Sequence, residues 1–262
     1  MKIMIKLALV LTMLASTSAM AHISYKGNFG TFDGTTATGT ITSNNSAATG
    51  NFGWIDATDT DDGDSHKTVA YRFSLTGTAN VSLTFAGTTY TPTTGAAITN
   101  AITPGFSVYQ GLVHLTGGAD YDNSAGSVLL RDTTTTEGSF KALSTWKVSN
   151  DADTTGTNPS ILTYKGHAYD GATFNGVAGA DGTADGSVTK TFTLAAGDYS
   201  VFVGGTDNSQ NTGFGNPGAT TVKYGVSASL AITPVPEPET YLMMMLGLTA
   251  VAGRLRQRRF AA

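Results

Sequence analysis

Apolar and polar side chains alternate with a period of two along several segments, and this alternation constrains the chain more than any other feature. The clearest segments are residues 69–75, 81–85, 188–194, 199–203 and 222–232. Clusters of glycine, asparagine and aspartate separate them, and no long pattern of helical period occurs. Because successive side chains of a strand point to opposite faces, the pattern predicts strands with one buried face. We therefore expect an all-β fold, an antiparallel β-sandwich.

The N-terminus, MKIMIKLALVLTMLASTSAMA, has the three parts of a signal peptide. Lys2 and Lys6 precede a short apolar run, and Ala19-Met20-Ala21 has the small-x-small form of a cleavage site. The apolar run is about half as long as the roughly 20 residues that a spanning helix needs. We predict a signal peptide over residues 1–21, which makes His22 the first residue of the exported chain.

The C-terminus combines a short apolar run with a cluster of arginines. Residues 241–253 are apolar, and Arg254, Arg256, Arg258 and Arg259 follow. At about 1.5 Å per residue the run covers about 20 Å of a hydrocarbon core of about 30 Å, and snorkelling arginines can extend its reach. Positive residues stay cytoplasmic, so the rest of the chain would lie outside. We predict a C-terminal transmembrane helix; the alternative is an amphipathic tail on the membrane surface.

Pro236, Glu237 and Pro238 precede this run directly. The proline-glutamate-proline triplet, apolar run and arginine cluster resemble the PEP-CTERM sorting signal of Gram-negative bacteria. The resemblance implies insertion in the inner membrane, processing by an exosortase, and delivery to the cell surface or an exopolysaccharide matrix. The predicted parts are thus a signal peptide (1–21), a β-sandwich domain (22–233) and a sorting signal (234–262).

The central domain is acidic and has no cysteine. Residues 22–233 contain 9 basic and 17 acidic residues, a net charge of about −8. This charge argues against binding to nucleic acid or to anionic lipid. Without disulfides, the stability of the exported domain must come from packing or bound metal.

The order of the segments resembles a second family. Residues 71–75, 81–85, 105–109 and 194–203 follow each other as in bacterial pre-peptidase C-terminal domains and related jelly rolls. The resemblance implies a jelly-roll-like, non-catalytic accessory module of the kind that often holds calcium and binds polymers.

Five aspartates gather before the first clear strand, and Gly63 among them allows a tight turn. They are the candidate calcium ligands Asp56, Asp59, Asp61, Asp62 and Asp64. Calcium takes six to eight oxygen ligands at about 2.3–2.6 Å, so several carboxylates must converge on it. The stretch is not an EF-hand, because the twelfth position from Asp59 is Ala70 rather than a glutamate. The alternative is a solvated acidic turn.

His22 raises a copper alternative. After cleavage its α-amine and imidazole can chelate copper, as in the histidine brace of lytic polysaccharide monooxygenases, with His66, His114 or His167 as the further ligand. The alternative is that His22 follows the cleavage site by chance.

Other catalytic chemistry has little support. The chain has no cysteine and no G-x-S-x-G motif, and Glu137 is the only glutamate of the central domain, which excludes a glycosidase with paired glutamates. An aspartate pair stays open, and the candidates are Asp120, Asp122, Asp151 and Asp153.

Two further stretches have two interpretations each. Trp54, Trp146 and the tyrosines could form a sugar-stacking platform, but the alternation around Trp146 favours a core position. Residues 171–186 are rich in glycine and aspartate and form either a loop, which we favour, or a second ion-binding turn.

The sequence as a whole predicts an exported surface or matrix protein that is not an enzyme. We expect a structural or polysaccharide-associated binding module, stabilised by calcium. The rival hypothesis is a copper or hydrolytic enzyme that acts on extracellular polysaccharide.

Overall fold

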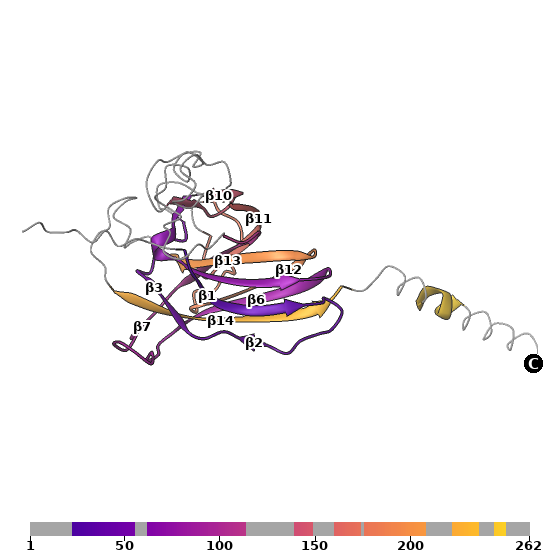
Figure 1. Cartoon of the computed structure of the whole chain (residues 1–262), viewed down its shortest axis with the longest axis horizontal. Coiled ribbons are helices and arrows are strands. Elements are labelled where there is room, and N and C mark those ends of the chain that lie inside the picture. The colour runs from indigo at the N-terminus through magenta and orange to yellow at the C-terminus, as the bar shows by residue number, and fades with distance from the viewer. Residues whose placement is uncertain are drawn as a thin grey trace, which may run out of the picture.

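The computed structural model describes residues 23–55, 62–113, 139–148, 160–173, 176–207, 222–235 and 244–249. Strands dominate this part of the chain and form two large sheets and one two-stranded sheet (Figure 1). Helix is confined there to a 3-10 turn, η1 (Ser65–Lys67), and to residues 244–249. The predicted all-β chain with two sheets is confirmed.

The first sheet holds six strands in the order β1-β5-β13-β8-β11-β10. The strands are β1 (Tyr25–Phe32), β5 (Val69–Leu75), β13 (Gly197–Gly205), β8 (Pro104–Gln110), β11 (Ser160–Tyr169) and β10 (Trp146–Val148). All neighbours are antiparallel except β1 and β5, which run parallel.

The second sheet is centred on the long strand β14 (Lys223–Pro234). Its order is β12-β6-β14-β2, and β3 and β7 also pair with β14. The further strands are β12 (Ser187–Leu194), β6 (Ala79–Thr88), β2 (Ile41–Thr42), β3 (Ser46–Thr49) and β7 (Asn100–Ala101), while β4 (Asp62–Asp64) and β9 (Ser139–Lys141) form the small sheet. Strand β7 is parallel to β14. The prediction of purely antiparallel pairing is therefore wrong at β1/β5 and β7/β14.

The two large sheets share one hydrophobic core. Tyr71 of β5 contacts Phe85 of β6 with ring centroids 5.6 Å apart, and Phe85 contacts Phe106 of β8 at 4.8 Å. Short connections cross between the sheets: residues 76–78 carry the chain from β5 to β6, and residues 195–196 carry it from β12 to β13. The sandwich is thus closed by short crossings between its layers.

A second cluster covers the other face of the first sheet. Trp146 packs against Phe202 with centroids 5.4 Å apart, and Trp54 packs against Tyr169 at 5.2 Å. Strands β8 and β13 are consequently buried on both faces, so the expectation of one buried face, made for residues 199–203, is wrong for β13. Both tryptophans are only 2% exposed, which confirms the core position of Trp146 and rules out a surface platform built on them.

The flanking segments fall largely outside the described residues. Residues 1–21 and 236–243 lie outside them, and no described helix is long and apolar enough to cross a membrane. The signal peptide, the C-terminal transmembrane helix and the jelly-roll resemblance stay predictions.

Candidate functional site

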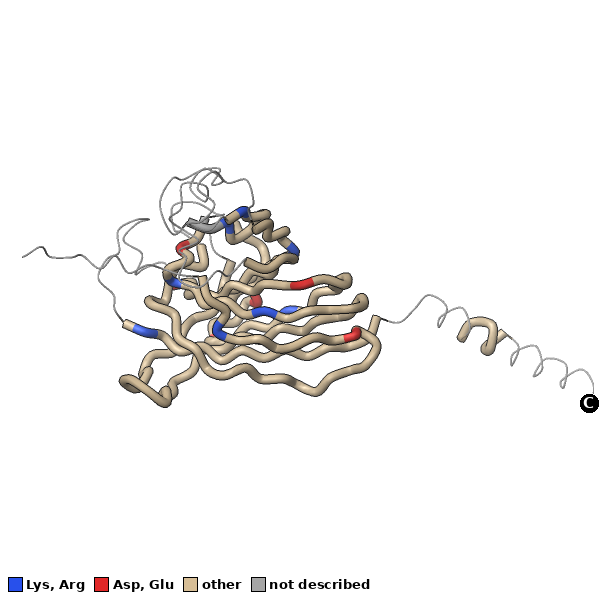
Figure 2. Tube along the Cα trace, in the orientation of Figure 1, with Lys and Arg blue, Asp and Glu red and all other residues tan. Residues whose placement is uncertain are grey.

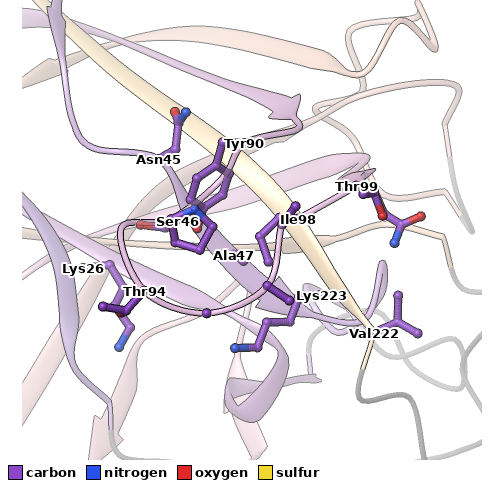
Figure 3. A pocket seen from close by; sticks show the side chains of 15 residues that line it. Lys26, Asn45, Ser46, Ala47, Tyr90, Thr94, Ile98, Thr99, Val222 and Lys223 are labelled. Carbon is purple, nitrogen blue, oxygen red and sulfur yellow. The ribbon is translucent and has the colours of Figure 1, made fainter.

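A groove with a volume of about 700 Å³ opens where the two sheets and one long connection meet. Its walls come from β1, from β3 and the residue before it, from the connection between β6 and β7, and from the start of β14. The lining residues are Lys26, Asn45, Ser46, Ala47, Tyr90, Pro92, Thr94, Gly95, Ala96, Ala97, Ile98, Thr99, Asn100, Val222 and Lys223 (Figure 3). We call this surface the lysine groove.

The wall of the lysine groove depends on close packing around Gly225. At Tyr224 and Gly225, strand β14 pairs with β3 on one side and with β7 on the other. A Cβ atom on Gly225 would lie 2.2 Å from the carbonyl oxygen of Thr88 and 3.3 Å from a side-chain carbon of Ile98. Only glycine lets the connection after β6 approach β14 this closely.

The connection between β6 and β7 forms a pinned loop. The Tyr90 amide donates to the Ile98 carbonyl at 3.1 Å, and the Ile98 amide donates to the Tyr90 carbonyl at 2.8 Å. Between them Gly95 has a φ of 100°, a value that favours glycine. The exposed residues 93–97 therefore project as a short loop from a fixed base, and Figure 3 shows this loop arching past Thr94.

The charge in the lysine groove is of one sign. Lys26 and Lys223 are exposed, and the lining contains no aspartate, glutamate or histidine. Neither lysine forms a salt bridge with a carboxylate of the described residues. Charged residues are sparse over the described strands (Figure 2), so among the described residues these two ammonium groups set the charge of the groove.

A buried hydroxyl lies behind the groove. Tyr71 is fully buried, and its hydroxyl makes no hydrogen bond of normal geometry within the described residues. Burial raises the pKa of Tyr71 to about 12, while the Ser46 side chain opposes part of this rise and Tyr90 adds slightly to it. Ser46 and Tyr90 both line the groove, and Figure 3 shows the Tyr90 ring next to Ser46. The Tyr71 hydroxyl thus lies close to the inner wall.

A smaller hollow of about 250 Å³ lies beside Trp54, Tyr169 and Asp170. The two carboxylate oxygens of Asp170 accept hydrogen bonds from the amides of Asp185, at 3.1 Å, and Gly186, at 2.9 Å. Burial raises the pKa of Asp170, because the hydrogen bonds only partly offset the loss of solvent. This carboxylate therefore ties down the glycine-rich connection between β11 and β12, which supports interpreting that stretch as a loop.

The predicted calcium ligands fall mostly outside the described residues. Asp56, Asp59 and Asp61 lie outside them, and Asp62 is described only as backbone in β4. Asp64 caps η1: its Oδ1 accepts from the His66 amide at 2.9 Å and lies 3.2 Å from His66 Nδ1. No group of three or more metal-ligating side chains occurs among the described residues. The calcium site stays a prediction.

The histidines considered for copper are placed in part. His22 and His114 lie outside the described residues, so the copper site also stays a prediction. His167 Nε2 is 2.6 Å from the Ala178 carbonyl, which can only accept, so Nε2 donates and Nδ1 accepts from the Tyr164 hydroxyl. Burial lowers the pKa of His167, which favours this neutral form. Both ring nitrogens are engaged, and a metal at His167 would have to displace one partner.

The four candidate catalytic aspartates and Glu137 also lie outside the described residues.

The sequence analysis did not identify the lysine groove, because Lys26, Tyr90 and Lys223 come from three distant parts of the chain. The one signal in the sequence was that Lys26 and Lys223, two of the few lysines of the acidic central domain, lie near its N-terminal and C-terminal ends.

A family model described as the PEP-CTERM protein-sorting motif matches residues 234–259. The match includes Pro236, Glu237 and Pro238 and confirms the resemblance that these residues predicted. The chain carries a PEP-CTERM sorting signal. This PEP-CTERM signal indicates an exported protein that an exosortase sorts to the surface or the extracellular space.

Two solved structures are similar to the PEP-CTERM chain at low identity. CorA, a surface-associated copper-binding protein important in copper acquisition by Methylomicrobium album BG8, is 14% identical, with 78% of this chain and 97% of CorA covered and a TM-score of 0.43. MopE is a secreted protein of Methylococcus capsulatus in which an oxidised tryptophan facilitates copper binding. It is 14% identical, with 79% of this chain and 87% of MopE covered and a TM-score of 0.40. No curated protein matches it.

Proposed function

We propose that this PEP-CTERM chain is a non-catalytic polysaccharide-binding module of the cell surface or extracellular matrix, and that the lysine groove is its binding site. The observation that carries the proposal is the groove's lining. Hydroxyl and amide side chains, the Tyr90 ring and two lysines surround one open space of ligand size.

The lining suits a sugar chain. Ser46, Thr94 and Thr99 offer hydroxyl groups, and Asn45 and Asn100 offer amides that both donate and accept. Sugar hydroxyls also donate and accept, so these side chains can pair with them in either sense. The half-buried Tyr90 ring offers an apolar face with a polar edge, the type of surface on which a pyranose ring packs.

The same lining favours binding over cleavage. Hydrolysis of a glycosidic bond uses a pair of carboxyl groups on either side of that bond, and the groove lining has none. Its charged groups are two lysines without a neighbouring base. The lysine groove would therefore hold a polymer without altering it, as a surface or matrix protein requires.

The proposed partners of the protein are an exosortase and an exopolysaccharide, and the proposed bound ion is calcium. The exosortase processes the C-terminal signal, and the exopolysaccharide occupies the groove. Calcium at the acidic turn around Asp59 and Asp61 would join residues before β5 to the sandwich and stabilise it.

Affinity electrophoresis of the full-length protein tests the polysaccharide proposal. Native gels would contain neutral or acidic polysaccharides, and retardation measures binding. We expect at least one polymer to retard the wild type. Tyr90→Ala should weaken that binding about threefold to tenfold through loss of ring packing, whereas Tyr90→Phe should retain most of it.

Thr191→Ala, on the exposed outer side of β12, is the matched control and should migrate as the wild type does. Absence of retardation by every polymer, or equal retardation of wild type and Tyr90→Ala, would contradict the proposal.

A further inference from the structure

The two lysines of the groove come from different sheets. Lys26 lies on β1 of the first sheet, and Lys223 begins β14 of the second. Figure 3 shows both side chains on the same side of the loop that carries Thr94. Two positive charges are thus presented to one groove from separate walls.

These lysines are set in an acidic domain. The net charge of residues 22–233 is about −8, yet the groove lining has only positive charges. A surface that repels anions in general but is positive at one groove favours an anion that enters this groove. The absence of salt bridges to described carboxylates leaves both ammonium groups available to such a ligand.

We propose that the lysine groove binds an acidic polysaccharide, with carboxylate groups of the sugar chain paired with Lys26 and Lys223. This inference rests on the proposed function and adds the charge class of the ligand. Each ammonium group has three donors and no acceptor, so it pairs with a carboxylate and also donates to adjacent sugar hydroxyls.

A sugar chain fits the groove better than an acidic peptide does. The groove lies beside the start of β14, where β3 and β7 already occupy both edges of the strand. No free strand edge is therefore offered there for an extended peptide to pair with. The side chains between the lysines are hydroxyls, amides and the Tyr90 ring, which match ring hydroxyls and the apolar face of a sugar.

The buried hydroxyl behind the wall supports the same site. The Tyr71 hydroxyl has no hydrogen-bond partner of normal geometry within the described residues and lies near Ser46 of the lining. Buried polar groups normally have partners. A water or ligand hydroxyl bound at Ser46 would provide polar surroundings at this point of the wall.

The test compares polymers that differ in charge. Full-length wild type would be titrated with polygalacturonate, dextran, dextran sulfate and poly-glutamate at low and high salt, and binding followed by affinity electrophoresis. We expect polygalacturonate to bind at least tenfold more tightly than dextran. The difference should shrink at 0.5 M salt, where the screening length falls to roughly 4 Å.

A paired substitution assigns the site. Lys26→Gln combined with Lys223→Gln should weaken binding of polygalacturonate about tenfold or more. Lys147→Gln combined with Lys165→Gln removes the same charge from exposed positions on β10 and β11 and should change the affinity less than twofold. Equal melting temperatures of the two double variants would show that both fold.

The outcomes separate the two proposals. If dextran and polygalacturonate bind equally and the groove lysines have no effect, the acidic ligand is wrong while the polysaccharide function stands. If no polymer binds, both fail. Equal loss in both double variants, tighter binding of dextran sulfate, or equal binding of poly-glutamate would each overturn the assignment of a carboxylated sugar chain to this groove.

Discussion

Tyr71 combines a ring in the main core with a hydroxyl that lacks a regular partner. The ring contacts Phe29 and Phe85, with centroid distances of 5.9 Å and 5.6 Å. The ring therefore contributes to packing, while burial of the hydroxyl costs free energy that the nearby Ser46 side chain offsets only in part. The two contributions can be separated by removing the hydroxyl alone.

Tyr71→Phe should stabilise the protein against alkali. Burial raises the pKa of Tyr71 from 10.0 to about 12, so the folded state holds its proton more tightly than the unfolded state. The contribution of this residue is intact below pH 10 and declines as the pH rises to 12, by about 1.4 kcal/mol at pH 11. Urea unfolding of wild type and Tyr71→Phe at pH 8 and pH 11 measures the difference.

Between pH 8 and pH 11, the free energy of unfolding of Tyr71→Phe should fall by about 1.4 kcal/mol less than that of the wild type. Tyr199→Phe is the comparison variant. Burial also raises the pKa of Tyr199, but its hydroxyl donates a hydrogen bond to the Ala195 carbonyl at 2.7 Å. An equal decline in wild type and Tyr71→Phe would contradict the burial of the Tyr71 hydroxyl.

For single residues, the sequence predicted burial correctly where a local pattern determines it. Ser144, Trp146 and Val148 are two positions apart and share one face of an alternating stretch, and the core position predicted for Trp146 from that pattern is correct. Lys26, Tyr90 and Lys223 could not be brought together from sequence, because they lie on β1, on the connection after β6 and on β14, which meet only through strand pairing and the packing of the two sheets. Such contacts depend on register, which no local pattern specifies.

Among the elements, the start of β14 leaves no room for a side chain at Gly225. Gly225→Ala would place a Cβ atom 2.2 Å from the Thr88 carbonyl, and backbone must move to relieve the clash. We expect the free energy of unfolding to fall by about 1–3 kcal/mol, the usual cost of overpacking. Gly39→Ala is the matched control, because nothing lies within 4 Å of its added Cβ.

Urea unfolding of both variants measures the loss, and polysaccharide binding shows whether the groove wall moves with it. Gly225→Ala should also weaken binding, since Ile98 lines the groove and contacts the new methyl group. A Gly225→Ala protein as stable as Gly39→Ala would mean that the approach of the 90–98 loop to β14 is looser than described.

Strand prediction succeeded where one alternating face is buried and failed where a bulge or a second layer intervenes. Strands β5, β6, β12 and β14 follow the predicted segments closely. Strand β11 was missed: its register shifts between Tyr164 and Gly166, so Leu162 and Tyr169 both pack into the second cluster although their spacing along the chain is odd. The burial of β8 on both faces depends on Trp54 and Trp146, which lie far away in sequence.

For the whole molecule, the acidic turn before β5 predicts a dependence of stability on calcium. A site formed only in the folded state stabilises it by about 2.7 kcal/mol when calcium is about a hundred times the dissociation constant. Chelator should therefore lower the melting temperature of the wild type by several degrees. Asp59→Asn combined with Asp61→Asn should melt at the chelated temperature in either condition.

Asp207→Asn combined with Asp198→Asn is a control for lost negative charge, and it should retain the response to chelator. Wild-type protein that melts at the same temperature with and without chelator would contradict the calcium site and leave the solvated acidic turn.

We expect delivery of the folded domain to depend on the prolines of its C-terminal signal. The sorting motif matches residues 234–259, and β14 ends at Pro234, so the last strand of the sandwich leads directly into the signal. Prolines resist helix formation and keep the backbone extended, which suits recognition of Pro236–Pro238 by a processing enzyme. In a host with an exosortase, Pro236→Ala with Pro238→Ala should leave full-length protein in the inner membrane. Immunoblots of membrane and surface fractions measure its distribution. Pro159→Ala with Pro217→Ala removes two prolines elsewhere and should be sorted like the wild type. A motif variant that is shortened and surface-exposed to the wild-type extent would show that sorting does not depend on these prolines.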